Sequence, residues 1–129
     1  MINHAQATFD VRGFSATNLE RCNNWHNIND WSPMEWGAAA AGELGELCNV
    51  LKKIKRYDQN IQQNATSQSR EVLVSMAAEE LADTICYLDL VATSLGIDLT
   101  EAVVSKFNAI SLRENLPQRL ALPEAALGG

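Results

Sequence analysis

Four carboxylates form two pairs with the same spacing in this 129-residue chain. Glu43 and Glu46 are three residues apart, and Glu80 and Asp83 repeat that spacing further along. Residues three apart in an α-helix lie on one face, a turn from each other. At about 100° per residue, each pair shares its helix face with apolar side chains, so both pairs are expected to point inward.

Carboxylates directed into an apolar interface are unfavourable unless cations compensate them. Hard oxygen ligands in this number favour Mg²⁺ or Mn²⁺ over zinc or copper. Either pair alone is typical of a solvated helix face, but two such pairs on neighbouring helices are far less common. The sequence therefore predicts a site for two or more Mg²⁺ or Mn²⁺ ions, with the ligands Glu43, Glu46, Glu80 and Asp83.

The helices that position these pairs have recognisable start signals. The segment Ser32–Glu35 combines a serine N-cap with a proline at the first helical position, and it predicts a helix that ends at about Tyr57. A second long helix is predicted from near Ser69 to a point before Gly96, a residue suited to helix termination. Because the intervening segment is short and rich in Gln, Asn and Ser, the two helices are expected to be antiparallel neighbours.

Shorter elements flank this hairpin. The capping box Asp98–Glu101 predicts a further helix that Pro117 closes, and a helix in the N-terminal arm is predicted to start at Thr17. The fold class is therefore all-α, with a helical hairpin core that forms a four-helix bundle. The single domain 1–129 is divided into an N-terminal arm (about 1–31), catalytic helices (about 32–114) and a loosely ordered tail (about 115–129).

The segment Met76–Leu95 places apolar side chains in nearly every direction around the predicted helix. A helix of this kind must be covered all round, and one chain has few helices with which to cover it. We expect a dimer or higher oligomer with this helix at its centre. A monomer whose N-terminal segment wraps round the helix is the alternative. Glu79 and Asp89 point to other sides and are expected to be solvated or paired with neighbours.

Composition and charge narrow the function classes. A net charge of −6 argues against capture of a nucleic-acid polymer, but bound cations would still allow a small polyanionic substrate. Three cysteines without paired spacing are typical of reduced thiols in the cytoplasm. The sequence shows neither a signal core nor an apolar stretch long enough to cross a bilayer, so we expect a cytoplasmic protein without a membrane partner.

Several motifs resemble the MazG-like family of all-α nucleoside triphosphate pyrophosphohydrolases. The resemblance covers roughly Trp31 to Pro117, and the motifs that carry it are Gly42–Leu47, Lys52-Lys53, Glu79–Asp83, Tyr87–Leu90, Gly96–Leu99 and Lys106–Asn108. It implies hydrolysis of nucleoside triphosphates, with dNTPs favoured, between the α- and β-phosphates to a monophosphate and pyrophosphate. It also implies a homodimer or homotetramer of four-helix bundles and a role in removing unwanted nucleotides. Some members carry a further glutamate where this chain has Gly42, so water activation falls to the remaining carboxylates.

Within this interpretation, Glu43 or Glu46 is the candidate general base, since a carboxylate that accepts a proton from metal-bound water is the simplest arrangement. Spacing does not choose between them. The candidate phosphate-binding residues are Lys53, Lys106, Asn108 and Tyr87, of which Lys106 and Asn108 are placed by the resemblance. A solvated Lys53 and a core Tyr87 are the alternatives.

Aromatic residues in the N-terminal region are candidates for holding the base. Trp25, His26 and Trp31 could stack on it or contact it. Core packing or an oligomer interface is the alternative for the tryptophans, and His26 could equally be a ligand or a surface residue. Trp36, on the side of its helix near Leu44, Leu47 and Leu51, is expected to pack in the core.

Two other classes compete with this function. A di-iron carboxylate bundle would need Glu-x-x-His pairs, but His4 and His26 lie outside both long helices. A non-enzymatic module, in which metal holds a helical oligomer together, remains the alternative to an enzyme.

Overall fold

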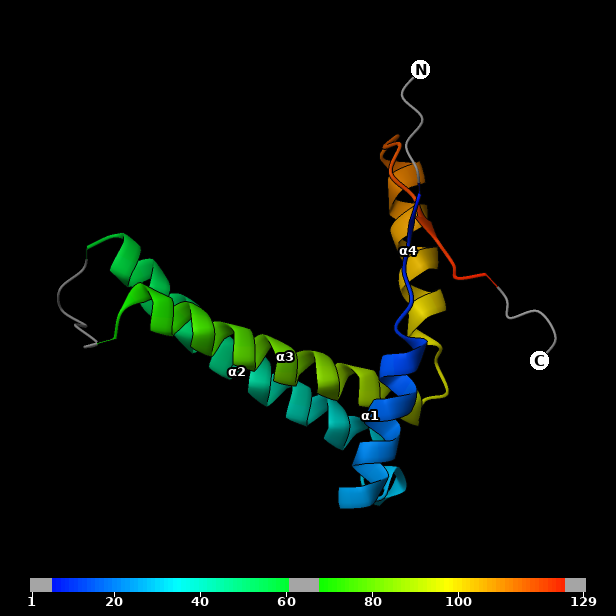
Figure 1. Ribbon diagram of the computed structural model, residues 1–129, viewed down its shortest axis with the longest axis horizontal. Coiled ribbons are helices and arrows are strands. Elements are labelled where there is room, and N and C mark those ends of the chain that lie inside the picture. Colours follow the sequence, from blue (N-terminus) through cyan, green and yellow to red (C-terminus); the bar gives the residue numbers. More distant parts are fainter. Residues whose placement is uncertain (1–5, 61–67, 125–129) are drawn as a thin grey trace.

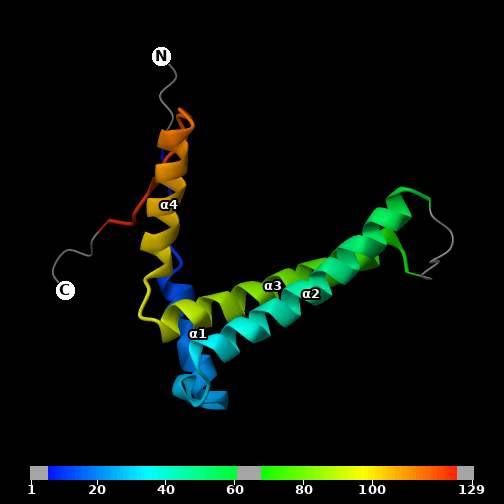
Figure 2. The ribbon, with the colours of Figure 1, turned by 180° about the vertical axis from the view of Figure 1, so that it is seen from behind.

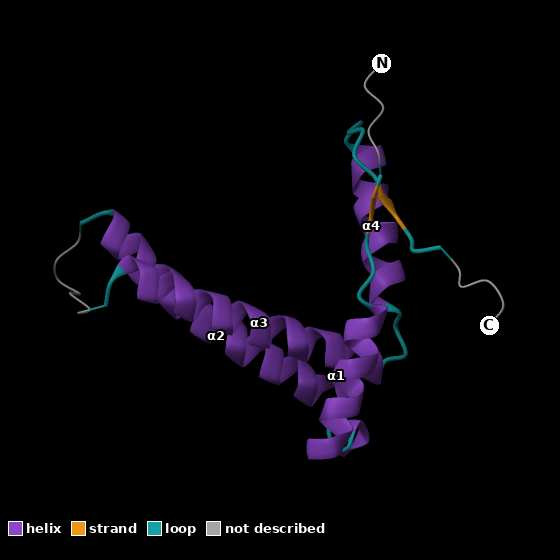
Figure 3. Cartoon of the chain, viewed as in Figure 1, coloured by secondary structure: helices purple, strands orange, loops and turns teal. Residues whose placement is uncertain are grey.

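The computed structural model describes residues 6–60 and 68–124, and these residues are mostly helical (Figure 1). The two strands are only two residues each, as the cartoon in Figure 3 shows. The all-α prediction is therefore confirmed. In chain order the elements are β1 (Ala7–Thr8), α1 (Arg12–Trp25), the 3₁₀ turn η1 (Ile28–Asp30), α2 (Pro33–Asp58), α3 (Arg70–Ser94), α4 (Leu99–Arg113) and β2 (Leu120–Ala121).

Side-chain caps begin three of the four helices at the predicted positions. The Ser32 hydroxyl accepts a hydrogen bond from the Glu35 N–H at the start of α2 (3.3 Å). The Ser69 hydroxyl and the Asp98 carboxylate cap α3 and α4 in the same way, each at 3.2 Å. Each cap satisfies a backbone donor that has no partner within its own helix. Gly96, with φ of +69°, follows α3 in the left-handed conformation that glycine adopts without strain.

α2 and α3 run side by side as an antiparallel hairpin (Figures 1 and 2). Apolar side chains that include Leu47, Val50 and Leu73 are buried between or beside them. At the loop end, Arg70 forms two hydrogen bonds with the Asp58 carboxylate (2.8 and 3.3 Å), which ties the start of α3 to the end of α2. The predicted connection lies largely in residues 61–67, outside the described residues.

α1 packs on α3 at the end of the hairpin opposite the loop (Figure 1). The prediction that it starts at Thr17 was wrong, since the helix begins at Arg12. Its start depends partly on a contact distant in sequence, in which the Val11 N–H donates to the Thr100 hydroxyl (2.8 Å). Asp10 adds a local contact by accepting from the Arg12 N–H (3.0 Å).

α4 projects from that same end, away from the hairpin (Figure 2). It ends at Arg113, before Pro117, and Asn115 follows with a φ of +55°. The prediction of a loosely ordered tail was wrong for β2, because Leu120 and Ala121 pair in parallel with Ala7 and Thr8. This pairing could not be predicted from local patterns because it joins opposite ends of the chain. Residues 125–129 lie outside the described part.

One face of α3 remains uncovered within the chain. Three apolar residues of α3 and the residue that caps its C-terminus are about half exposed, and we call these four the apolar stripe: Leu81 (50%), Ile85 (48%), Leu88 (51%) and Leu95 (56%). α1 therefore covers α3 only in part. Among the described residues, no helix is both long and apolar enough to span a membrane.

Candidate functional site

Three of the four predicted metal ligands converge in the middle of the hairpin. Glu43 and Glu46 come from α2 and Glu80 comes from α3, with carboxylate oxygens that all lie within 4.8 Å of one another. We call these three residues the carboxylate cluster. Asp83 follows one turn later on α3 but does not belong to this cluster. It is exposed and lines the adjoining pocket together with Glu43.

The cluster is electrostatically strained because three acidic groups crowd together. Hydrogen bonding with Glu43, burial and the charge of Glu46 raise the pKa of Glu80 to about 7. Like charges and desolvation both disfavour the ionised form, which explains the direction of this shift. At neutral pH the cation-free cluster therefore retains a proton for part of the time.

One atom of the cluster indicates what it could bind. The Oε2 atom of Glu80 is buried and has no hydrogen-bond partner among the described residues. A buried carboxylate oxygen without a partner is uncommon in folded proteins and needs an explanation. A hard divalent cation would supply one, because every donor in the cluster is a carboxylate oxygen. The residues present thus fit Mg²⁺ or Mn²⁺.

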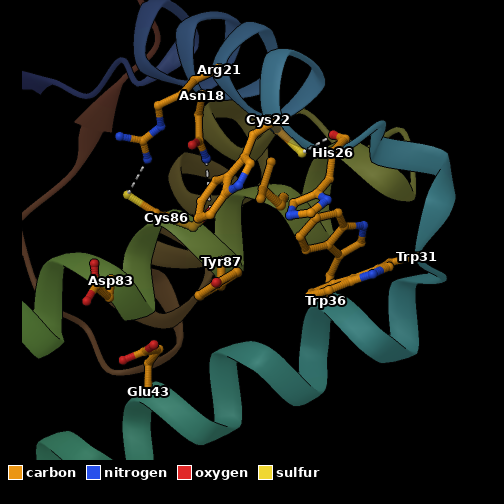
Figure 4. A pocket seen from close by; sticks show the side chains of 12 residues that line it. Asn18, Arg21, Cys22, His26, Trp31, Trp36, Glu43, Asp83, Cys86 and Tyr87 are labelled. Atoms are coloured by element: carbon orange, nitrogen blue, oxygen red, sulfur yellow. Dashed lines mark hydrogen bonds between the residues drawn. The ribbon is translucent and has the colours of Figure 1, made fainter.

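A pocket of about 410 Å³ adjoins the cluster (Figure 4), within the size range of small-molecule sites. Its walls come from α1, α2, α3 and the segment between α1 and α2. The lining residues are Asn18, Arg21, Cys22, Trp25, His26, Trp31, Trp36, Glu43, Asp83, Cys86, Tyr87 and Leu90. One side of the pocket is thus acidic and the other aromatic.

The aromatic side forms a continuous series of rings. His26 and Trp31 are stacked with ring centroids 6.2 Å apart, and Trp31 lies 4.5 Å from Trp36. Trp36 continues the series to Tyr87 at 6.3 Å. Trp36 is only 3% exposed and donates from Nε1 to the Ile28 carbonyl (3.0 Å), so the prediction that it packs in the core is confirmed. Trp31 remains half-buried at the pocket wall.

The predicted phosphate-binding residues are dispersed within one chain. Tyr87 lines the pocket, and half-buried Lys53 lies further along α2. Lys106 and Asn108 belong to α4, which points away from the hairpin (Figure 1). The Asn108 amide is occupied elsewhere, because it donates to the Leu120 carbonyl (2.9 Å) and accepts from the Leu120 N–H (2.8 Å).

The contribution of α1 to the pocket was not predicted from the sequence. Asn18, Arg21 and Cys22 line the pocket, and their spacing places them on one helix face. Asn18 is held in place because its Nδ2 donates to the Cys86 carbonyl and to Asp89, each at 2.9 Å. Asp89 is fully buried and also accepts from the Ser15 hydroxyl, so it is paired with α1 rather than solvated. The three-four spacing on α1 was the available signal, but nothing local showed which way that face points.

No protein-family model, curated protein or solved structure matches this chain. The two features that matter are the carboxylate cluster with its unpartnered oxygen and the pocket that joins acidic and aromatic sides.

Proposed function

We propose that the chain is a Mg²⁺-dependent enzyme that hydrolyses nucleoside triphosphates, dNTPs in particular, to a monophosphate and pyrophosphate. The observation that carries this proposal is the pocket in which Glu43 and Asp83 face a series of aromatic rings. A nucleotide has one flat aromatic end and one highly charged end, and such a pocket offers each end a complementary surface. The motifs that resemble MazG-like enzymes support the same reaction, and removal of unwanted nucleotides in the cytoplasm is its proposed role.

The chain's own residues have distinct tasks in this reaction. Trp31, with His26 and Trp25, holds the base by stacking, which gives affinity without strong base identity. Tyr87 and Lys53 contact the phosphates or sugar. Glu43 or Glu46 accepts a proton from the water that attacks the α-phosphorus, as a general base must lie within hydrogen-bond reach of that water.

The divalent cation would be held by the carboxylate cluster, with Asp83 as an additional ligand. Two or more Mg²⁺ ions, or Mn²⁺ in their place, would supply charge neutralisation for the triphosphate and a lowered pKa for the attacking water. The unpartnered Glu80 oxygen supports this assignment, because a bound cation would give this buried acceptor the partner that it lacks.

A second copy of the chain is part of the proposal. The apolar stripe on α3 leaves four large side chains about half exposed, and exposed apolar patches of this kind mark interfaces. Pairing two hairpins along it would complete a four-helix bundle in a homodimer or homotetramer. Because α4 points away from its own hairpin, Lys106 would then serve the site of a second copy, while Asn108 remains engaged by Leu120.

A non-enzymatic oligomerisation module is the second candidate. The apolar stripe and the acidic cluster would also be present in a helical assembly that metal holds together. This candidate gives no role to the aromatic side of the pocket, so binding of a nucleotide separates the two proposals.

The decisive experiment is incubation with each common NTP and dNTP plus Mg²⁺ in ¹⁸O-labelled water, with products resolved by chromatography and mass spectrometry. We expect the monophosphate to carry the label and pyrophosphate to be unlabelled. Glu46→Gln and Asp83→Asn should abolish turnover while the proteins remain folded. Glu79→Gln, an exposed neighbour of Glu80, is the matched control and should retain activity.

Other products decide against the proposal in specific ways. Release of a diphosphate and inorganic phosphate would place the cleavage at another bond. Absence of turnover with every nucleotide, in a protein that Mg²⁺ still stabilises, would favour the oligomerisation module.

A further inference from the structure

α1 supplies the pocket's cationic side chain. Arg21 is the one lysine or arginine among the described residues that line the pocket. The side chain extends from α1 above the pocket, on the same side as Asp83 and Cys86 (Figure 4). Its Nη2 atom lies 3.9 Å from the Cys86 sulfur. Since Cys86 follows Asp83 by three residues on α3, the guanidinium lies about one helical turn from the acidic side.

The Arg21 guanidinium has hydrogen-bond donors that are available to a ligand. A thiol is a weak acceptor, and no described carboxylate oxygen lies within 4.0 Å of the guanidinium. Four other arginines differ in this respect, because each of them donates to a carboxylate or a backbone carbonyl: Arg12, Arg70, Arg113 and Arg119. The pocket thus contains a planar cation that makes no strong hydrogen bond to a described carboxylate.

The position of Arg21 is fixed by a polar contact one turn earlier on α1. Asn18 donates to both the Cys86 carbonyl and the buried Asp89 carboxylate, and Asp89 also accepts from Ser15. These bonds hold α1 against α3 at the wall of the pocket. The backbone of Arg21 is therefore held in place before any ligand arrives, which reduces the entropy lost on binding.

We infer that Arg21 binds the phosphate chain of the nucleotide, with Asn18 and Asp89 as positioning residues. The inference rests on the proposed function, and it assigns to α1 a contact that none of the predicted phosphate-binding residues provides. An arginine guanidinium matches phosphate oxygens in a bidentate geometry, so it holds the charged end without reading the base. Together with cations at the carboxylate cluster, it would enclose the phosphate chain from two sides.

The test compares binding of a nucleoside with binding of its α,β-methylene triphosphate analogue plus Mg²⁺, by calorimetry, in wild type and Arg21→Gln. We expect the substitution to weaken the triphosphate analogue about 10- to 100-fold, the effect of lost hydrogen bonds to a charged group. Nucleoside affinity should stay within about twofold. Arg21→Lys should restore part of the loss, since a point charge remains without the planar fork.

Arg113→Gln is the matched control, because Arg113 is an exposed arginine on α4 outside the pocket. It should leave both affinities unchanged. Equal losses for nucleoside and triphosphate analogue in Arg21→Gln, or no loss at all, would overturn the role of Arg21. Thermal melting identifies any unfolded variant. If Arg21→Gln is unfolded, Arg21→Lys is compared with wild type in its place.

The two proposals fail in different ways. If the wild-type protein hydrolyses a nucleotide and Arg21→Gln has the same KM and the same affinity, the inference is overturned and the proposed function remains intact. A wild-type protein that neither binds nor hydrolyses any nucleotide would overturn both.

Discussion

Glu43 on α2 and Glu80 on α3 place carboxylate oxygens within 4.8 Å of each other across the helical hairpin. This proximity, with Glu46 beside it, creates a group that holds a proton at a pH where an isolated glutamate would not. In the proposed function, the same crowding would allow the cluster to bind divalent cations. Stability, metal affinity and activity would then be linked through a few oxygen atoms.

The pKa of Glu80 predicts how the metal-free protein responds to pH. Its folded value of about 7 lies above the ordinary 4.5, so between these values the folded chain holds a proton that the unfolded chain releases. The free energy of unfolding should therefore fall as pH rises from about 4.5 to 7. Urea denaturation in EDTA measures this slope. The pKa values of Asp58 and Asp98 are lowered from the ordinary 3.8, so these two groups change the free energy of unfolding at pH values below this window.

Glu80→Gln is the corresponding variant. It removes the titrating group while it keeps the shape, so the slope between pH 4.5 and 7 should flatten and the metal-free variant should be the more stable protein at pH 8. An unchanged slope in this variant would show that another group carries the proton.

Mg²⁺ should stabilise the wild-type protein, because the cation binds the folded cluster and no comparable site exists in the unfolded chain. At a concentration 100 times its Kd, one ion adds about 2.7 kcal/mol to the free energy of unfolding. The affinity of the cluster for Mg²⁺ should increase from pH 6 to 8, because the cation must displace the proton that Glu80 holds at lower pH. Thermal melting with and without Mg²⁺ tests this. Glu43→Gln should lose the effect and Glu79→Gln should retain it.

Trp31 and Trp36 should respond differently to alanine substitution. Trp36→Ala removes a buried core side chain and should cost about 3–5 kcal/mol of folding stability. Trp31→Ala removes a half-buried stacking surface at the pocket and should instead weaken nucleotide binding by about 1–3 kcal/mol. Denaturation and calorimetry measure the two effects separately. Equal affinities of Trp31→Ala and wild type would remove the stacking role.

Asp89→Ala should loosen the attachment of α1. The substitution leaves donors on Ser15 and Asn18 without their acceptor, at a cost of about 1–3 kcal/mol in unfolding free energy. Hydrogen exchange should become faster in α1 than in the α2–α3 hairpin. If hydrogen exchange in α1 is equally slow in wild type and in the variant, apolar contacts alone hold α1.

The apolar stripe predicts a self-association that charge should disrupt. A Leu81→Lys, Leu88→Lys double variant places two charges on the half-exposed face of α3 and should shift a dimer or tetramer to the monomer. Light scattering after gel filtration measures the mass. Met34→Lys, on an exposed residue at the start of α2, is the control and should not change the assembly. A wild-type monomer at high concentration would contradict the proposed interface.

Local sequence signals predicted the helical hairpin, and the structure brings together three of the four carboxylates predicted as metal ligands. Ser32, Ser69 and Asp98 cap their helices with bonds to residues three positions away, so these starts are determined within a few residues of sequence. The spacing of Glu43 and Glu46 and the antiparallel neighbour that carries Glu80 follow from the same local rules. The three residues of the carboxylate cluster could therefore be predicted from local rules, but the place of Asp83 outside it could not.

Contacts between distant segments decided the rest. α1 begins where Val11 meets Thr100, the tail pairs with Ala7 and Thr8, and Arg21 reaches the pocket because Asp89 holds Asn18. The direction of α4 is also decided by tertiary structure. It places Lys106 and Asn108 away from the carboxylate cluster. Helix spacing determines which residues share a face, but only packing against another element determines what that face meets.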